Sequence, residues 1–164
     1  MSLILKNKET IVYKGFNFRC SIGKKGTTKN KIEGDKKTPI GTFKLGNLYY
    51  RRDRVNKPKT KLKSFPLTKN LGWCNDIKSK KYYNKIVKVS KKLQHEKLYR
   101  KDYKYNYFIP IKYNTDNVIL GKGSAIFIHL TRNYNSTAGC IALKEKDFLI
   151  LCKLLDKKTK IKIT

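Results

Sequence analysis

Short apolar segments separated by turn residues occur through most of this chain. This pattern predicts a fold that consists largely of strands. The segment LILKNKETIVYKGFNFRCSIG predicts a hairpin that turns at Asn7 and Lys8, followed by a strand from about Phe16 to Ser21. A polar loop rich in glycine leads into a further strand predicted over 42–50. The segments YNYFIPIKYN and SAIFIHL predict two more strands. These features indicate β architecture.

The C-terminal part of the chain has a different period. The segment KEKDFLILCKLLDKK has apolar residues at helical spacing: Phe148, Leu149, Leu151, Cys152 and Leu155. We expect this helix to pack one face on the sheet, with Cys152 in the core. The closing TKIKI alternates and is predicted as an edge strand. The expected fold class is mainly β with a short C-terminal helix, or α+β by content.

The middle of the chain, residues 51–96, is rich in lysine and shows no clear periodicity. It contains GWCND and KYYNKIVKV, whose aromatic and turn residues indicate an ordered excursion. The chain has 164 residues, of which 39% are hydrophobic and 12% aromatic. This length and composition predict a single globular domain over residues 1–164, and we expect it to be a monomer.

The balance of charge is strongly basic, with 40 Lys plus Arg against 11 Asp plus Glu and a formal net charge of +29. Such a surface attracts polyanions, so nucleic acid, acidic lipid and anionic cell-wall polymer all qualify as partners. The excess of basic residues is mostly lysine. The chain also has many asparagines, tyrosines and isoleucines. That pattern is also typical of compositional drift in AT-rich genomes, and both interpretations stay open here.

The start of the chain, MSLILKNKETIVYKG, lacks the apolar core and the small-residue cleavage site of a secretory signal. No run approaches the roughly 18 apolar residues of a membrane span. We therefore expect a cytoplasmic protein or a mature form whose signal has been removed. The four cysteines form no C-x-x-C pair, which argues against a zinc site and a thioredoxin-like motif and leaves a disulfide open.

The stretch IFIHLTRNYNSTAGCIAL places His129 near the end of a predicted strand and Cys140 directly after a glycine. A thiol nucleophile needs a neighbouring base, and a histidine on a rigid strand facing a cysteine could provide one. Gly139 lets the backbone turn sharply, so that the amides of Gly139 and Cys140 can point at a developing oxyanion. The alternatives are a structural strand histidine and a small buried cysteine.

Several ordered motifs resemble the L,D-transpeptidase (YkuD-type) family. TPIGTF is followed far downstream by HLTRNYNSTAGCIAL, and KIEGDKKTPIGTFKL, LYYRRDR, GWCND, KYYN and GSAIFIHL occur in the order seen in a compact single-domain branch of that family. The resemblance covers roughly residues 16–156. It implies a β-rich sandwich or barrel, with Cys140 as nucleophile, His129 as base, and Gly139 and Cys140 as oxyanion donors.

The implied reaction is acyl transfer on peptidoglycan stem peptides through a thioester, with no metal or organic cofactor. The chain has Thr137 and Ala138 where many members have Ser-His, and Ala142 where many have arginine. Thr137 is a candidate substrate-binding residue. Arg132 is the replacement candidate for binding the substrate carboxylate.

Further candidates lie in the middle segment and in the loop before TPIG. Trp73, Asn75 and Asp76 could form a wall and a polar rim for the substrate, or a core tryptophan followed by an ordinary turn. For Glu33 and Asp35 we expect a structural turn or a salt bridge rather than catalysis. His95, next to Glu96, could line the cleft, but a lone histidine in a segment rich in lysine favours an exposed side chain without a role.

Three other functions compete with the transpeptidase. Water in place of the acceptor would make the same site an L,D-carboxypeptidase. A non-catalytic basic module would bind wall polymer or nucleic acid through lysines and tyrosines, although we expect no specific nucleic acid partner. A thiol protease would need an Asn or Asp to orient the base, for which Asn133 and Asn135 are available. The family's substrate implies the periplasm or cell wall, although no signal peptide is visible.

Overall fold

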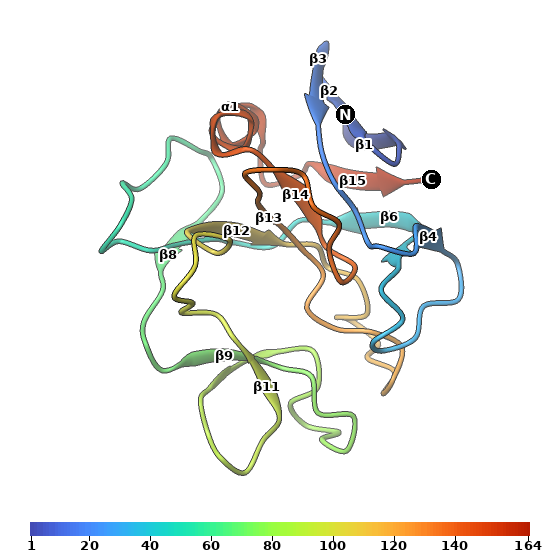
Figure 1. Ribbon diagram of the computed structural model, residues 1–164, viewed down its shortest axis with the longest axis vertical. Helices are drawn as coiled ribbons and strands as arrows, with labels where there is room; N and C mark the ends of the chain where they lie inside the picture. The colour runs from blue at the N-terminus through green and yellow to red at the C-terminus, as the bar shows by residue number, and fades with distance from the viewer.

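The computed structural model describes residues 1–164 and contains fifteen strands and one helix (Figure 1). The strands are β1 (Ser2–Asn7), β2 (Thr10–Tyr13), β3 (Phe16–Arg19), β4 (Thr27–Thr28), β5 (Thr38–Pro39), β6 (Gly41–Lys44), β7 (Leu48–Tyr50), β8 (Ser64–Pro66), β9 (Leu71–Cys74), β10 (Ile86–Lys88), β11 (His95–Lys97), β12 (Tyr107–Pro110), β13 (Phe127–Leu130), β14 (Ile141–Leu143) and β15 (Lys160–Ile163). The helix is α1 (Glu145–Leu154). The mainly β fold with a short C-terminal helix is confirmed. The helix is not long and apolar enough to cross a membrane.

The two ends of the chain meet in a five-stranded sheet with the order β3-β2-β1-β15-β6. The predicted hairpin is present, because β1 and β2 pair antiparallel across a turn at Lys8 and Glu9. The prediction that TKIKI forms an edge strand is wrong, since β15 pairs with β1 on one side and β6 on the other. Its alternation arises because Ile161 and Ile163 face the core while the intervening lysines are exposed.

A second five-stranded sheet has the order β14-β13-β12-β7-β8 and carries the candidate site. Here β13 pairs antiparallel with β12 and parallel with β14. The strand predicted over 42–50 is two strands, β6 and β7, which belong to different sheets. The chain changes sheets at Gly46, whose amide donates to the Pro110 carbonyl at 2.7 Å. A Cβ on Gly46 would lie 3.2 Å from the Pro110 side chain, so a glycine suits this close approach.

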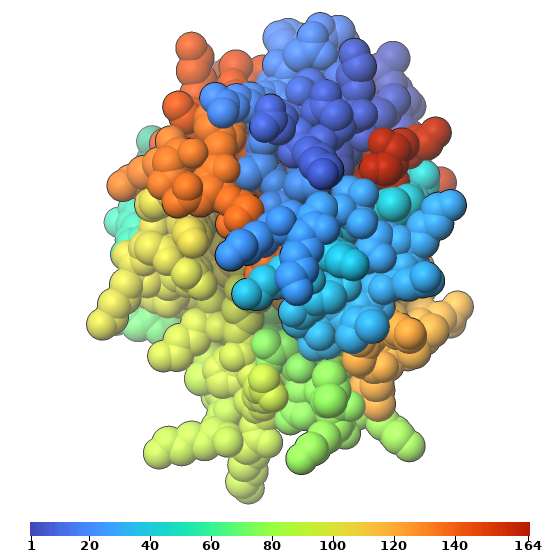
Figure 2. Space-filling model, turned by 45° about the vertical axis from the view of Figure 1, so that its right-hand side comes forward, coloured from blue at the N-terminus to red at the C-terminus, as the bar shows by residue number.

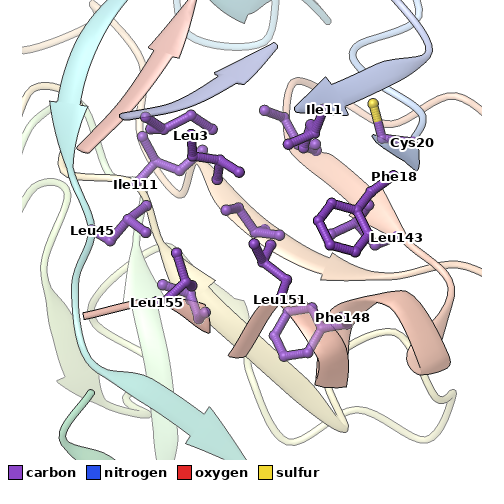
Figure 3. Packing of buried hydrophobic residues seen from close by; sticks show 14 of the residues in the cluster. Leu3, Ile11, Phe18, Cys20, Leu45, Ile111, Leu143, Phe148, Leu151 and Leu155 are labelled. Atoms are coloured by element: carbon purple, nitrogen blue, oxygen red, sulfur yellow. The ribbon is translucent and has the colours of Figure 1, made fainter. Parts of the chain in front are cut away.

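Side chains from both sheets and from α1 meet in one cluster of 25 buried residues (Figure 3). The helix contributes Phe148, Leu151 and Cys152, all of which have no exposed surface. The apolar spacing that predicted the helix therefore describes its buried face, and Cys152 is the core residue that we expected. Ile141 and Leu143 of β14 lie in the same cluster, so the strand after Cys140 is fixed by packing.

The middle segment is ordered, as expected, and contains a three-stranded sheet with the order β10-β9-β11. Figure 1 shows β9 and β11 at the end of the molecule away from β1 to β3. A second cluster of eight buried residues joins this segment to the second sheet, and its members include Trp73, Tyr105, Phe127 and Cys140. The middle segment thus packs against the strand and turn that carry the candidate site residues.

Candidate active site

Cys140 and His129 line the same pocket, which has a volume of about 470 Å³. Its walls come from residues 31–34, 96–105 and 124–142, together with Asn75. The loop after β3 (blue), the segment near residue 100 (yellow) and the loop after β13 (orange) come together on the face shown in Figure 2. Three segments that are distant in the sequence therefore enclose the two residues that sequence analysis selected.

Strand pairing explains why the thiol and the imidazole share this pocket. β13 and β14 run parallel, with His129 opposite Ala142. Side chains alternate along a strand, so Cys140, two residues before Ala142, points to the same face as Ala142. The Phe127 amide donates a hydrogen bond to the Cys140 sulfur at 3.3 Å, which ties the cysteine to the strand that carries the histidine.

The thiol of Cys140 is enclosed, with only 8% of the residue exposed. Its S–H donates to the Ala125 carbonyl at 3.2 Å. Burial raises the pKa of this thiol to about 12, and the nearby negative charge of Glu96 acts in the same direction. Cys140 is therefore a protonated thiol in the resting protein.

The imidazole of His129 is held in one tautomer. Its Nδ1 lies 2.9 Å from the Leu130 carbonyl, which can only accept, so Nδ1 carries the proton and Nε2 keeps a lone pair. The ring of Tyr105 packs edge-on against it, with centroids 5.5 Å apart. Burial lowers the pKa of His129 to about 4. The imidazole is thus neutral at physiological pH and can accept a proton.

The turn before Cys140 depends on Gly139 and Thr38. Gly139 has a φ of 141°, and a Cβ there would lie 2.9 Å from the Lys37 carbonyl oxygen. The Thr38 hydroxyl donates to the Gly139 carbonyl at 2.8 Å and accepts from the Gly23 amide at 2.9 Å. Thr38 of the TPIGTF motif therefore holds the turn that presents the candidate nucleophile, and two motifs far apart in the sequence meet there.

The two amides predicted to bind an oxyanion differ in their surroundings. The Gly139 amide donates to the Thr137 hydroxyl at 3.1 Å, and that hydroxyl donates to the Cys140 carbonyl at 2.6 Å. The Cys140 amide donates to no group of the protein. Cys140 is therefore the freer of the two donors, and the oxyanion role of both amides stays a prediction. Thr137 lines the pocket, and its hydroxyl stabilises the turn through these two hydrogen bonds.

Of the three candidates in the middle segment, only one lines the pocket. Asn75 lines the pocket, and its Oδ1 is buried without a hydrogen-bond partner. Trp73 does not line the pocket. It packs edge-on against Phe127, with ring centroids 5.0 Å apart, and its indole N–H donates to Asn84 at 2.9 Å, so it is the core tryptophan of the two alternatives. Asp76 also lies outside the pocket and accepts from the Lys78 amide within its own turn.

Arg132 does not reach the pocket of Cys140. It is exposed, and its guanidinium lies 4.0 Å from the centroid of the Tyr103 ring, beside a smaller neighbouring hollow. The cationic side chains on the wall of the main pocket are instead Lys31, Arg100 and Lys104. The pocket wall thus carries other cations than the one that chain order suggested, and of these Lys31 and Arg100 form ion pairs within the protein.

Two carboxylates on the pocket wall were not predicted as site residues. Glu33 accepts hydrogen bonds from the hydroxyl groups of Tyr83 and, at 2.8 Å, Ser124. Glu96 accepts from the hydroxyl of Tyr105. The only signal in the sequence was the rarity of acidic residues, since neither glutamate lies in a local pattern that indicates a site.

The remaining predictions concern residues away from the thiol. All four cysteines are free, so the open question of a disulfide is answered. Asp35 forms an ion pair with Lys31, as expected. His95 is half-buried rather than exposed, because it packs across Gly72 and its Nδ1 lies 2.8 Å from the Leu93 carbonyl. It does not line the pocket.

Comparisons with known proteins bear on the fold and the family of the chain. The chain is similar in fold to the helical cell shape determining protein Pgp2 from Campylobacter jejuni, with a TM-score of 0.52 and 18% identity. The alignment covers 98% of this chain and 45% of that one, so the chain spans less than half the length of the Pgp2 structure. No curated protein matches the chain. The sequence model of the L,D-transpeptidase (YkuD) catalytic domain matches residues 2–163, and the chain therefore belongs to this family.

Proposed function

We propose that this protein is a cysteine-dependent L,D-transpeptidase that acts on peptidoglycan stem peptides and forms cross-links through a thioester. The observation that carries the proposal is the shared pocket of Cys140 and His129, which is lined by an enclosed thiol and a neutral imidazole. Membership of the family supports the reaction type. The similarity in fold to a cell shape determining protein is consistent with a substrate in the cell wall, outside the cytoplasmic membrane.

The first half-reaction transfers an acyl group to sulfur. The Cys140 sulfur attacks the carbonyl of the donor's diamino-acid residue while its proton passes to Nε2 of His129. The Cys140 amide is free to donate to the oxyanion that forms. Collapse of this intermediate breaks the bond to D-alanine, whose amine leaves with the proton from His129. A thioester remains on Cys140.

The second half-reaction restores the thiol. An acceptor amine attacks the thioester carbonyl and gives a proton to His129, and the sulfur leaves and recovers that proton. The raised pKa of Cys140 and the lowered pKa of His129 mean that both groups rest in neutral form. Proton transfer must therefore accompany attack on the substrate.

Two alternatives remain, one that uses the same site and one without catalysis. If water resolves the thioester, the protein is an L,D-carboxypeptidase on the same substrate. A non-catalytic basic module would bind wall polymer or nucleic acid through the excess of 40 Lys plus Arg over 11 Asp plus Glu. The pocket favours an enzyme, because a binding module has no use for a thiol and a base that face one cavity.

Mass spectrometry of disaccharide-tetrapeptide muropeptides incubated with the protein tests the proposal. We expect cross-linked dimers with wild type, and a loss of turnover of at least about 100-fold in Cys140→Ala, which removes the nucleophile. Cys74→Ala is the matched control, because this buried thiol does not line the pocket. Tripeptides without dimers would favour the carboxypeptidase. Full activity of a folded Cys140→Ala protein would refute the mechanism.

A further inference from the structure

The pocket that holds Cys140 also has an acidic side. Its wall carries two acidic residues, Glu33 and Glu96, against three basic ones, whereas the whole chain has 11 Asp plus Glu against 40 Lys plus Arg. The wall around the candidate nucleophile therefore departs locally from the charge of the whole molecule.

Neither carboxylate forms an ion pair with a cation of the protein. The partners of Glu33 are the hydroxyl groups of Tyr83 and Ser124, and the partner of Glu96 is the hydroxyl of Tyr105. None of the protein's ion pairs includes either glutamate. Hydroxyl donors fix the positions of the two carboxylates without neutralising them, and Glu96 is influenced by a nearby cation, Arg100.

The cations on the same wall are already engaged or exposed. Lys31 forms an ion pair with Asp35, and Arg100 forms one with Asp102 at 2.5 Å, while Lys104 is exposed to solvent. The Oδ1 of Asn75 adds a buried acceptor with no partner. This side of the pocket thus presents two carboxylates without an ion-pair partner and one amide oxygen without a donor. A ligand group with several N–H donors and a positive charge would match it.

Electrostatics within the pocket agree with such a ligand. Burial raises the pKa of Glu96, and the charge of Glu33 adds to this, although Arg100 opposes it. The charge of Glu96 in turn contributes to the raised pKa of the Cys140 thiol. A cation bound between the glutamates would reduce their repulsion and would favour the thiolate.

We propose that Glu33, Glu96 and Asn75 form a subsite that binds a primary ammonium group of the substrate beside Cys140. The inference rests on the proposed function for the source of this group, which is either the free amine of the donor's diamino acid or the acceptor amine. The glutamates are specificity-determining residues, and they favour substrates with a free amine over acetylated ones.

The subsite can be tested without the candidate nucleophile. Ala138 is exposed and lines the pocket, so Ala138→Cys in a Cys140→Ala background places a reporter thiol there. Peptide mapping measures the rates at which the trimethylammonium-ethyl and the uncharged methyl methanethiosulfonates modify this thiol. The thiolate displaces methanesulfinate and forms a mixed disulfide. The ratio of the two rates cancels any change in the thiol's own reactivity.

We expect the rate ratio to fall about 10-fold when Glu33→Gln and Glu96→Gln are combined, because two nearby charges that attract the cationic reagent are lost. Glutamine keeps an acceptor for the tyrosine hydroxyls, and thermal melting checks that the variants stay folded. Asp116→Asn is the matched control, since it removes an exposed charge away from the pocket and should change the ratio less than about twofold. An equal ratio with and without the glutamates would overturn the subsite.

A second measurement identifies the source of the ammonium group. If the donor supplies it, acetylation of the diamino-acid amine should slow single-turnover release of D-alanine by wild type, and the glutamine variants should lose this discrimination. If the acceptor supplies it, only resolution of the thioester should change. If the protein is inactive on muropeptides but the rate ratio still falls when the glutamates are replaced, the proposed function is refuted and the subsite is not. If the protein is active but the rate ratio does not change when the glutamates are replaced, this inference alone is refuted.

Discussion

At the scale of single residues, the enclosure of His129 has a consequence for stability. Its pKa is about 4 in the folded protein, against about 6.5 for an unperturbed histidine. Between these values the unfolded chain binds a proton that the folded one does not. The contribution of His129 to stability is therefore present above pH 6.5 and is lost as the pH falls toward 4, by about 3 kcal/mol in all.

We predict that His129→Gln weakens this pH dependence. Urea unfolding at pH 7 and pH 4 should show a smaller loss of unfolding free energy in the variant than in wild type, by about 2–3 kcal/mol. The variant must be compared with wild type, because protonation of other groups also destabilises the protein in acid. Asp35 and Asp102 are two of these groups, since hydrogen bonds and ion pairs lower their pKa values. His95→Gln removes the only other histidine and serves as control. The assignment would be wrong if His95→Gln flattened the profile and His129→Gln did not.

At the scale of elements, β5 and the turn before β14 behave as one unit. Thr38 is completely buried, and its hydroxyl joins the Gly23 amide to the Gly139 carbonyl. Two segments about a hundred residues apart are thus connected through one side chain. Any change there should act on the position of Cys140 as well as on the free energy of unfolding.

We predict that Thr38→Val lowers the free energy of unfolding by about 2–4 kcal/mol, because it leaves a buried N–H and a buried C=O without their partner. Denaturant unfolding measures this loss. Thr38→Ser keeps the hydroxyl and should cost about 1 kcal/mol, the contribution of one buried methyl group. Muropeptide turnover, measured where both variants are folded, should fall further in Thr38→Val. Equal stability and equal turnover of the two variants would show that the hydroxyl does not hold the turn.

At the scale of the whole molecule, the net charge of +29 should affect the binding of a polymeric substrate. It should affect the chemical step in the pocket much less. Raising salt from about 50 to about 300 mM shrinks the Debye length by roughly a factor of two. We predict that sedimentation of the protein with isolated sacculi weakens steeply over this range. Turnover of a small soluble muropeptide, which depends on contacts inside the pocket, should fall much less.

Three other outcomes would carry a different meaning. An equal loss of sacculus binding and of small-substrate turnover would point to an effect of salt on the active site itself. Sacculus binding that ignored salt would leave the basic composition without a role in capture. Tight, salt-sensitive binding to DNA by a protein inactive on muropeptides would favour the basic module over the enzyme.

The amino-acid sequence by itself determined the local elements and the family. The alternation of apolar residues predicted the first hairpin, and helical spacing predicted α1 with Cys152 on its buried face. The order of the motifs, from TPIGTF to the glycine before Cys140, indicated the L,D-transpeptidase family that the comparisons show. These features could be predicted because hydrophobic period and turn residues are properties of neighbouring residues, and the order of motifs is visible along the chain without any knowledge of contacts.

Only the tertiary structure decided which of these elements meet. It placed β15 inside a sheet rather than at its edge, and it split the strand predicted over 42–50 between two sheets. It put Trp73 in the core and Arg132 outside the pocket, and it brought Glu33 and Glu96 to the wall beside Cys140. The physical reason is that strand partners and pocket walls are chosen by packing between distant segments, and no local pattern of residues encodes that choice.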